Sequence, residues 1–397
     1  MSIALRAVFF MTASTLLAQR GGGGPGGGFG GFNAPIGTLK NQAPPAVPGL
    51  DRYVKDQAAL VALGKAFFWD MQAGSDGVTA CASCHFHAGA DHRLQNQLAG
   101  STPNRVMTAA DFPFHKLSNT ASNRSAVVSD AAWVAGSMGV VERAFVDVQP
   151  GAAADLSSPV AKGSAFQVNG VHARQVTGRN TPSVINAVYN VRNFWDGRAS
   201  NIFTGATPFG ASDAAANVMA WRDGAAVRET VRLENSSLAS QAVGPALNPV
   251  EMSWSGREWA QLGRKLMALV PLGRQRVAAD DSVLGALANA DGNGLKTTYP
   301  LMIQAAFQDA YGNPAVMEQN FALFWGLAIQ AYETTLVSDD TPVDRFLAGQ
   351  TNALTALEQA GLREFQGGGS NCTNCHNGPE LTAAGFSNLL RRNGNVA

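Results

Sequence analysis

The stretch Cys81-Ala82-Ser83-Cys84-His85 has a counterpart near the other end of the chain, Cys372-Thr373-Asn374-Cys375-His376. Together the two stretches use all four cysteines of the 397-residue sequence. Two thiols three positions apart on one turn can each add to a vinyl group of a haem, and the adjacent histidine can then supply an imidazole nitrogen to the iron. The pattern therefore predicts two covalently bound haems c, with His85 and His376 as iron ligands.

Other uses of paired cysteines fit this sequence less well. A structural zinc site needs four ligands closing one tetrahedron, and it gives no reason for a histidine to follow each pair directly. A thioredoxin-like redox pair would lie beside a βαβ pattern, which the sequence lacks. Four cysteines in a chain of this length also exclude a disulfide-dense scaffold.

The composition is that of a globular protein with little charge. Apolar residues make up 46% and charged residues 15%, and 29 Lys and Arg balance 29 Asp and Glu. A chain with no net charge lacks the electrostatic signature of a protein that binds nucleic acid or an anionic membrane. Its length suggests about two or three domains.

The N-terminus resembles an export signal. Residues 1–20 have a positive start at Arg6 and an apolar run of about twelve residues, which suits a signal peptide and is too short to span a bilayer. This predicts a periplasmic protein, with an uncleaved N-terminal anchor as the alternative. Residues 21–50 are rich in Gly and Pro and predict a disordered leader. No later segment is long and apolar enough to predict a membrane span.

Helical patterns dominate the remainder, which predicts a mainly α fold with long loops. Residues 86–178 and 199–240 look irregular, and strand signals are sparse. Two haem domains are expected, an N-terminal one over 51–253 and a C-terminal one over 254–397. The predicted helices are Gln57–Trp69, a short one over Thr181–Tyr189, Arg257–Leu269, Pro300–Ala310, Glu318–Leu336 and Ala353–Phe365.

Several further blocks resemble one family. These are Arg179–Asn190 (RNTPSVINAVYN), Phe194–Ala199 (FWDGRA), Gln241–Met252 (QAVGPALNPVEM), Tyr332–Ser338 (YETTLVS) and Asp344–Gly349 (DRFLAG). In this order, together with the two haem motifs, they resemble the bacterial di-haem cytochrome c peroxidases and the related MauG-like enzymes.

The resemblance implies two cytochrome c-like domains with a calcium ion between them. It also implies an oxidoreductase that reduces hydrogen peroxide to water at the first haem. Electrons from a small c-type cytochrome or a cupredoxin would be relayed by the second haem, and a homodimer is compatible with the family.

Three residues match catalytic positions of the family. Trp195 matches the tryptophan between the haems, Glu251 the acid of the peroxide pocket, and Gln241 a second polar residue there. Peroxide must lose a proton from one oxygen and gain one on the other before the O–O bond breaks, and a buried carboxylate can move that proton. The plainer alternatives are core packing for Trp195 and a surface carboxylate after the Asn248-Pro249 turn for Glu251. MauG-like members are expected to carry an amide where Glu251 stands, so the glutamate favours peroxidase chemistry.

Two residues match metal ligands of the family. His172 lies eight positions before Asn180, as does the family's removable haem ligand, and the alternative is a solvated loop histidine. Asn180 matches a calcium ligand, and the alternative is a turn residue before Thr-Pro.

The sequence also departs from the compact peroxidases. Insertions lie between His85 and Val176 and between Ala199 and Gln241, and long insertions also occur in the rubber-oxygenase branch. A di-haem oxidase or oxygenase acting on a protein or polymer is therefore an alternative function, and a non-enzymatic electron carrier is another. Met, His and Tyr do not occur after His376, although the family places the second haem's other ligand there. This predicts that the second haem domain is C-terminally truncated and that the sequence is a fragment.

Overall fold

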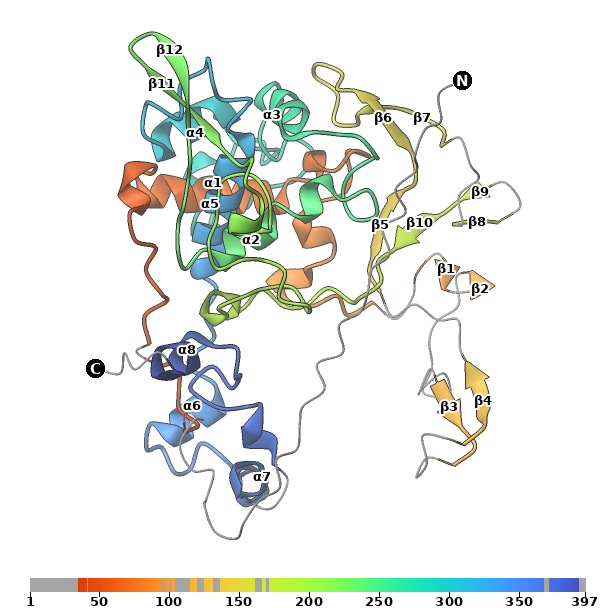
Figure 1. Ribbon diagram of the computed structural model, residues 1–397, viewed down its shortest axis with the longest axis vertical. Helices are drawn as coiled ribbons and strands as arrows, with labels where there is room; N and C mark the ends of the chain where they lie inside the picture. The colour runs from red at the N-terminus through yellow and green to blue at the C-terminus, as the bar shows by residue number, and fades with distance from the viewer. Residues whose placement is uncertain are drawn as a thin grey trace, which may run out of the picture. The chain divides into compact units, whose positions relative to one another are not determined.

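Helices form the body of the structure, and strands occur only in short pairs (Figure 1). The computed structural model describes residues 35–40, 42–93, 96, 98–99, 102–103, 115–119, 125–130, 136–160, 166–168, 171–367 and 371–392. The signal peptide predicted for residues 1–20 and half of the leader predicted for residues 21–50 lie outside these residues. The helices are α1 (Gln57–Trp69), α2 (Ser237–Ala242), α3 (Trp259–Met267), α4 (Tyr299–Ala306), α5 (Phe321–Thr334), α6 (Pro342–Leu347), α7 (Ala356–Gly367) and α8 (Phe386–Arg392).

The long predicted helices are confirmed, with shifted ends except at α1. Asp56 begins α1 by accepting a hydrogen bond from the amide of Ala59, and Thr298 caps α4 in the same way. The short helix predicted for Thr181–Tyr189 is wrong, since only the 3₁₀ turn Ala187–Tyr189 forms there. Asn186 has a left-handed φ of 62°, a backbone conformation that no α-helix contains.

The core is built around α5, which is largely apolar and is buried on nearly every side. Twelve of its fourteen residues are buried, and α1 packs along it (Figure 1). The two helices touch backbone to backbone at Gly64, where a Cβ atom would lie only 1.8 Å from the carbonyl oxygen of Ala328. Phe67 of α1 meets the ring of Trp325 at 4.9 Å, and the indole of Trp69 donates a hydrogen bond to the Tyr332 hydroxyl. These contacts hold the start of the first haem motif against α5.

The strands form antiparallel pairs, most of them within the predicted insertions. The pairs are β1 (Leu98–Ala99) with β2 (Thr102–Pro103), β3 (His115–Leu117) with β4 (Val127–Asp130), β5 (Met138–Val141) with β10 (Arg174–Val176), β6 (Ala144–Asp147) with β7 (Leu156–Ser158), β8 (Gln167–Val168) with β9 (Val171–His172), and β11 (Val218–Arg222) with β12 (Ala225–Glu229). Residues 86–178 are thus less loop-like than expected. Strands of two to five residues are too short to show an alternating pattern in the sequence.

A buried charge cluster fastens one insertion to the body. Asp155, just before β7, contacts the guanidinium of Arg257 at 3.0 Å and the ammonium of Lys265 at 2.8 Å, and all three side chains are fully buried. Lys265 lies on α3 and also donates to the carbonyl oxygens of Gly74 and Ala153. The cluster joins the β6–β7 pair to α3 and to the loop before the first haem motif.

Contacts with the body begin earlier in the chain than Asp51. The Thr38 hydroxyl donates to Asp344 at 2.7 Å, and the Tyr189 hydroxyl donates to the carbonyl oxygen of Gln42. The division into two domains after residue 253 stays a prediction, and the contacts of α1 with α4 and α5 cross it.

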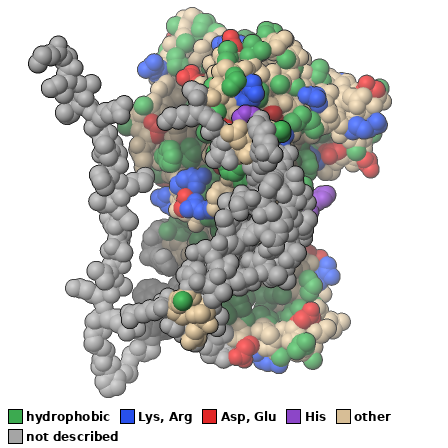
Figure 2. Space-filling view, turned by 90° about the vertical axis from the view of Figure 1, so that its right-hand side faces the viewer, with side chains coloured by type: hydrophobic (Ala, Val, Ile, Leu, Met, Phe, Trp, Pro, Cys, Tyr) green, Lys and Arg blue, Asp and Glu red, His purple; other side chains and the backbone are tan. Residues whose placement is uncertain are grey.

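The described surface carries charges of both signs, as the balanced charge of the sequence predicts. On the face shown in Figure 2, basic and acidic side chains are interspersed among hydrophobic ones wherever the surface is coloured. Within the part of the chain that the structure describes, no helix combines the length and the apolar character that crossing a membrane requires.

Candidate haem site

The two cysteine motifs adopt the same backbone turn. Cys81–Ser83 and Cys372–Asn374 each form a 3₁₀ turn, after which the histidine amide donates to the carbonyl oxygen of the first cysteine, at 3.0 Å for His85 and 2.9 Å for His376. This turn brings both sulfur atoms and the histidine of a motif to one short segment. The local geometry that haem attachment requires is therefore present twice.

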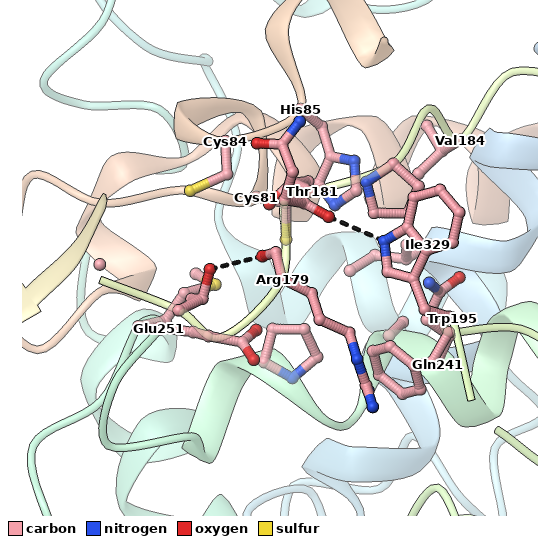
Figure 3. A pocket seen from close by; sticks show the side chains of 18 of the residues that line it. Cys81, Cys84, His85, Arg179, Thr181, Val184, Trp195, Gln241, Glu251 and Ile329 are labelled. Atoms are coloured by element: carbon pink, nitrogen blue, oxygen red, sulfur yellow. Dashed lines mark hydrogen bonds between the residues drawn. The ribbon is translucent and has the colours of Figure 1, made fainter. Parts of the chain in front are cut away.

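A cavity of about 380 Å³ opens directly beside the first motif (Figure 3). Cys81, Cys84 and His85 line it together with Trp195, Gln241 and Glu251, three residues that the sequence singled out as catalytic. The remaining wall comes from α1, Gly139 of β5, residues 177–184, the Phe194–Arg198 block, the end of α2 and the buried face of α5. The cavity thus unites segments that are far apart in the sequence.

The first motif presents its side chains in neutral form. Burial lowers the pKa of His85 to about 4, and the backbone of Pro182 and Gly89 offsets part of that effect. The buried Nδ1 of His85 makes no hydrogen bond of good geometry among the described residues, and its ring packs on Phe68 at 5.9 Å. Burial also raises the pKa of Cys81 and Cys84. A neutral imidazole with an unpaired nitrogen can serve as a metal ligand.

Glu251 faces the same cavity from the segment after α2. Burial raises the pKa of its carboxyl group, and the charge of Arg198 opposes this in part. One carboxylate oxygen accepts a hydrogen bond from the side-chain amide of Asn248 at 3.0 Å. Glu251 therefore lies in the cavity wall with its carboxyl group mostly buried, and this group keeps its proton to a higher pH than an exposed glutamate does.

Trp195 lies in the cavity wall with one side open. Its side chain is 68% exposed, and its indole N–H donates to the backbone oxygen of Asn180 at 2.8 Å, as the dashed line in Figure 3 shows. The neighbouring Asp196 bridges Arg179 and Arg198, and the hydrogen bond from Arg179 lowers its pKa to about 2. These ion pairs make the part of the cavity wall formed by Arg179 and Arg198 polar.

The two predicted metal ligands lie in different surroundings. Asn180 lines the cavity, where its amide donates to the backbone oxygen of Asp91 at 2.9 Å and its oxygen lies 3.4 Å from the Ser137 hydroxyl. His172 lies on the β8–β9 pair with its side chain exposed, outside the wall of the cavity. Among the described residues, no three His, Cys, Asp or Glu side chains are grouped so as to hold a metal ion.

The second motif is more open than the first. Cys375 and His376 are exposed, and the His376 ring packs near Phe365 of α7, with Nδ1 3.2 Å from the carbonyl oxygen of Leu381. The backbone amide of Val191 donates a hydrogen bond to the carbonyl oxygen of Ala384. This bond joins the segment after the second motif to the residues that follow the Arg179–Asn190 block. None of Cys372, Cys375 and His376 lines the cavity of the first motif.

Glu333 is an ionisable cavity residue that the sequence analysis did not single out. Glu333 on α5 is 5% exposed and lines the cavity, as does Ile329 one turn earlier. A signal for it exists, because Glu333 is the one charged residue of a largely apolar helix, in a block that already resembled the peroxidases.

Comparison with known proteins agrees with the site. A family model described as di-haem cytochrome c peroxidase matches residues 58–352. The cytochrome c551 peroxidase of Pseudomonas aeruginosa is 30% identical over 210 residues, which cover 53% of this chain and 39% of that protein. The cytochrome c peroxidase Ccp of Escherichia coli is 26% identical over 248 residues, which cover 60% and 37%.

These matches span about two fifths of the length of either relative. A solved diheme peroxidase of Burkholderia thailandensis aligns with 84% of this chain and 55% of its own, at 18% identity and a TM-score of 0.38. The family match covers well over half of the sequence, and the first haem motif, Trp195 and Glu251 lie within it. By this family match, the chain belongs to the di-haem cytochrome c peroxidase family.

Proposed function

We propose that the protein reduces hydrogen peroxide to water at the cavity of the first motif, in the periplasm. A small c-type cytochrome or a cupredoxin would supply the electrons, and the second haem would pass them to the first. The observation that carries the proposal is that Glu251, a carboxyl group with a raised pKa, lines the same cavity as Cys81, Cys84 and His85.

The residues of the first motif suit a haem c. Cys81 and Cys84 can form the two thioether bonds, and His85 has the neutral imidazole that an axial ligand needs. A bound haem supplies an iron centre that exchanges electrons with peroxide. Cys372, Cys375 and His376 repeat the arrangement for a second haem.

Glu251 moves the proton on which the reaction depends. As a carboxylate it takes a proton from one oxygen of peroxide, and as a carboxylic acid it returns that proton to the other oxygen, which leaves as water. The raised pKa favours both steps, because it moves the carboxyl group in the direction of the working pH, at which a general acid–base group is most effective. Asn248 holds the carboxyl group in place through its amide. Gln241, also in the wall, can orient the peroxide by hydrogen bonding.

The other matched residues have supporting roles in this proposal. Trp195 lies at the open side of the cavity, where its indole would shorten the path of electrons from the second haem. His172 would have to leave its exposed position on the β8–β9 pair to act as a removable ligand. A calcium ion at Asn180 and the homodimer stay predictions.

Replacing Glu251 by glutamine tests the proposal. Glu251→Gln keeps the shape of the side chain and removes the proton-carrying group, so we expect kcat for peroxide-dependent oxidation of a reduced donor cytochrome to fall about 100-fold or more. Haem content and the visible spectrum should match those of the wild type. Glu234→Gln, outside the cavity wall, is the control and should retain full activity.

Full turnover by Glu251→Gln would show that another group moves the proton. Peroxide consumption without donor oxidation in the wild type would instead favour the oxidase or oxygenase alternative.

A further inference from the structure

Glu333 is a buried carboxyl group without a partner. Five acidic residues are buried in the described part of the chain, and four of them are held by hydrogen bonds or ion pairs. Asp70 accepts from the Tyr299 hydroxyl, Asp91 pairs with an arginine, Asp155 lies between Arg257 and Lys265, and Asp344 accepts from threonine hydroxyls. Within the same described residues the carboxyl group of Glu333 has neither a hydrogen bond nor an ion pair. Burying a carboxyl group without a hydrogen-bond partner costs folding free energy, so a glutamate is a poor choice for a position that serves only packing.

The carboxyl group of Glu333 belongs to the cavity of the first motif. Glu333 lines the cavity from α5, one helical turn after Ile329, which Figure 3 shows in the wall. Its charge raises the pKa of the Cys81 thiol, so the carboxyl group lies near the attachment cysteine. Glu251 acts on Cys81 in the same sense but more weakly. Two glutamates therefore approach the first motif, one from α5 and one from the segment after α2.

The surroundings keep Glu333 protonated at neutral pH. Burial alone raises its pKa to about 8. Cys81 faces it from the first motif, and its helix neighbour Tyr332 is bonded to the indole of Trp69 on α1. The charged side chains of the cavity wall are Arg179, Arg198 and Glu251, and none of them pairs with Glu333. No positive charge is therefore in place to draw the proton away.

Peroxide reduction needs more protons than Glu251 can supply. Two protons and two electrons convert one peroxide into two waters, with the O–O bond broken and two new O–H bonds formed. The reduced donor protein provides the electrons. Glu251 returns the proton that it takes, so its contribution to the proton balance is zero. Both consumed protons must therefore come from groups other than Glu251, either a residue of the cavity wall or solvent.

We propose that Glu333 is a second proton-carrying residue of the cavity, which delivers one of the consumed protons and is then reprotonated from solvent. This inference rests on the proposed peroxidase function. It assigns different roles to the two glutamates. Glu251 moves a proton from one oxygen of the peroxide to the other, and Glu333 delivers a proton that comes from solvent.

The test uses the haem-loaded protein and the variant Glu333→Gln, which keeps the size of the side chain and cannot release a proton. We expect kcat to fall about 10- to 100-fold with haem content unchanged. In the wild type the rate should decline as the pH rises through about 8, where Glu333 loses its proton. In Glu333→Gln this alkaline decline should be absent. The control is Glu318→Gln, the same change just before α5, where the carboxylate is on the surface and pairs with Arg264.

A second measurement is independent of turnover. Infrared spectroscopy of the wild type should show the C=O stretch of a buried protonated carboxyl group that titrates near pH 8 and disappears in Glu333→Gln. The inference is overturned if this band is absent, or if Glu333→Gln turns over within about twofold of the wild type with the same alkaline decline. A wild-type protein that oxidises no donor with peroxide would overturn the proposed function itself, which is a different result.

Discussion

Glu333 couples the protonation of one side chain to the stability of the whole chain. Its folded-state pKa of about 8 lies well above the ordinary glutamate pKa of 4.5. Between these two values the unfolded chain loses the proton and the folded chain keeps it, so the free energy of unfolding falls as the pH rises. Below the lower value both states are protonated, and the effect is absent.

The pH dependence of stability in Glu333→Gln should show this coupling. We expect the variant to gain stability relative to the wild type by up to about 1.4 kcal/mol for each pH unit between roughly pH 4.5 and pH 8. Urea unfolding at pH 5 and at pH 8 measures the difference. Equal differences at both pH values would show that the carboxyl group is not buried in its neutral form.

At the scale of elements, the packing of α1 against α5 positions two walls of the cavity. α1 leads into the first motif and α5 carries Ile329 and Glu333, so any separation of these helices changes the site. Their contact at Gly64 leaves no room for a methyl group.

Gly64→Ala should force the two helices apart. We expect a loss of at least about 1–3 kcal/mol in the free energy of unfolding, from overpacking against the backbone of Ala328. Gly361→Ala on α7 is the matched control, because a methyl group there meets nothing within 4 Å and alanine favours a helix by roughly 0.5–1 kcal/mol. Thermal unfolding of both variants distinguishes them, and a tolerated Gly64→Ala would mean that α1 and α5 do not meet at this point.

The free energy of unfolding should be equally sensitive to a change in the buried charge cluster around Asp155. Asp155→Asn removes the negative charge between Arg257 and Lys265, and two buried cations remain without their partner. We expect a loss of about 3–5 kcal/mol. Asp309→Asn, at an exposed ion pair with Lys55, should change stability by less than about 1 kcal/mol. Similar denaturation midpoints for the two variants would contradict the burial of the cluster.

For the whole molecule, the proposal requires two covalent haems for each chain. Replacing Cys372 and Cys375 together by serine should halve the haem-to-protein ratio, measured by pyridine haemochrome absorbance and by mass. The first motif lies against α1 and the core, so its haem should remain. A ratio of one in the wild type would show that only one motif is loaded.

The sequence predicted those parts of the fold that depend on local pattern. The 13-residue helix Gln57–Trp69 was predicted to the residue, because its cap and its apolar spacing are local. The short helix at Thr181–Tyr189 was wrong, because the left-handed Asn186 leaves no distinct sign in the residue order. The paired strands of the insertions were missed, since each is stabilised by a partner strand and not by its own pattern.

The sequence by itself determined the haem chemistry, because two cysteines and a histidine on one turn carry it within five residues. It also indicated the family through its ordered blocks. Only the tertiary structure decided which polar residues share the cavity: it brought Trp195, Gln241 and Glu251 to the first motif and left His172 at the surface. It alone added Glu333, because burial and the lack of a partner arise from α1 and α5 packing together, and no local pattern encodes them.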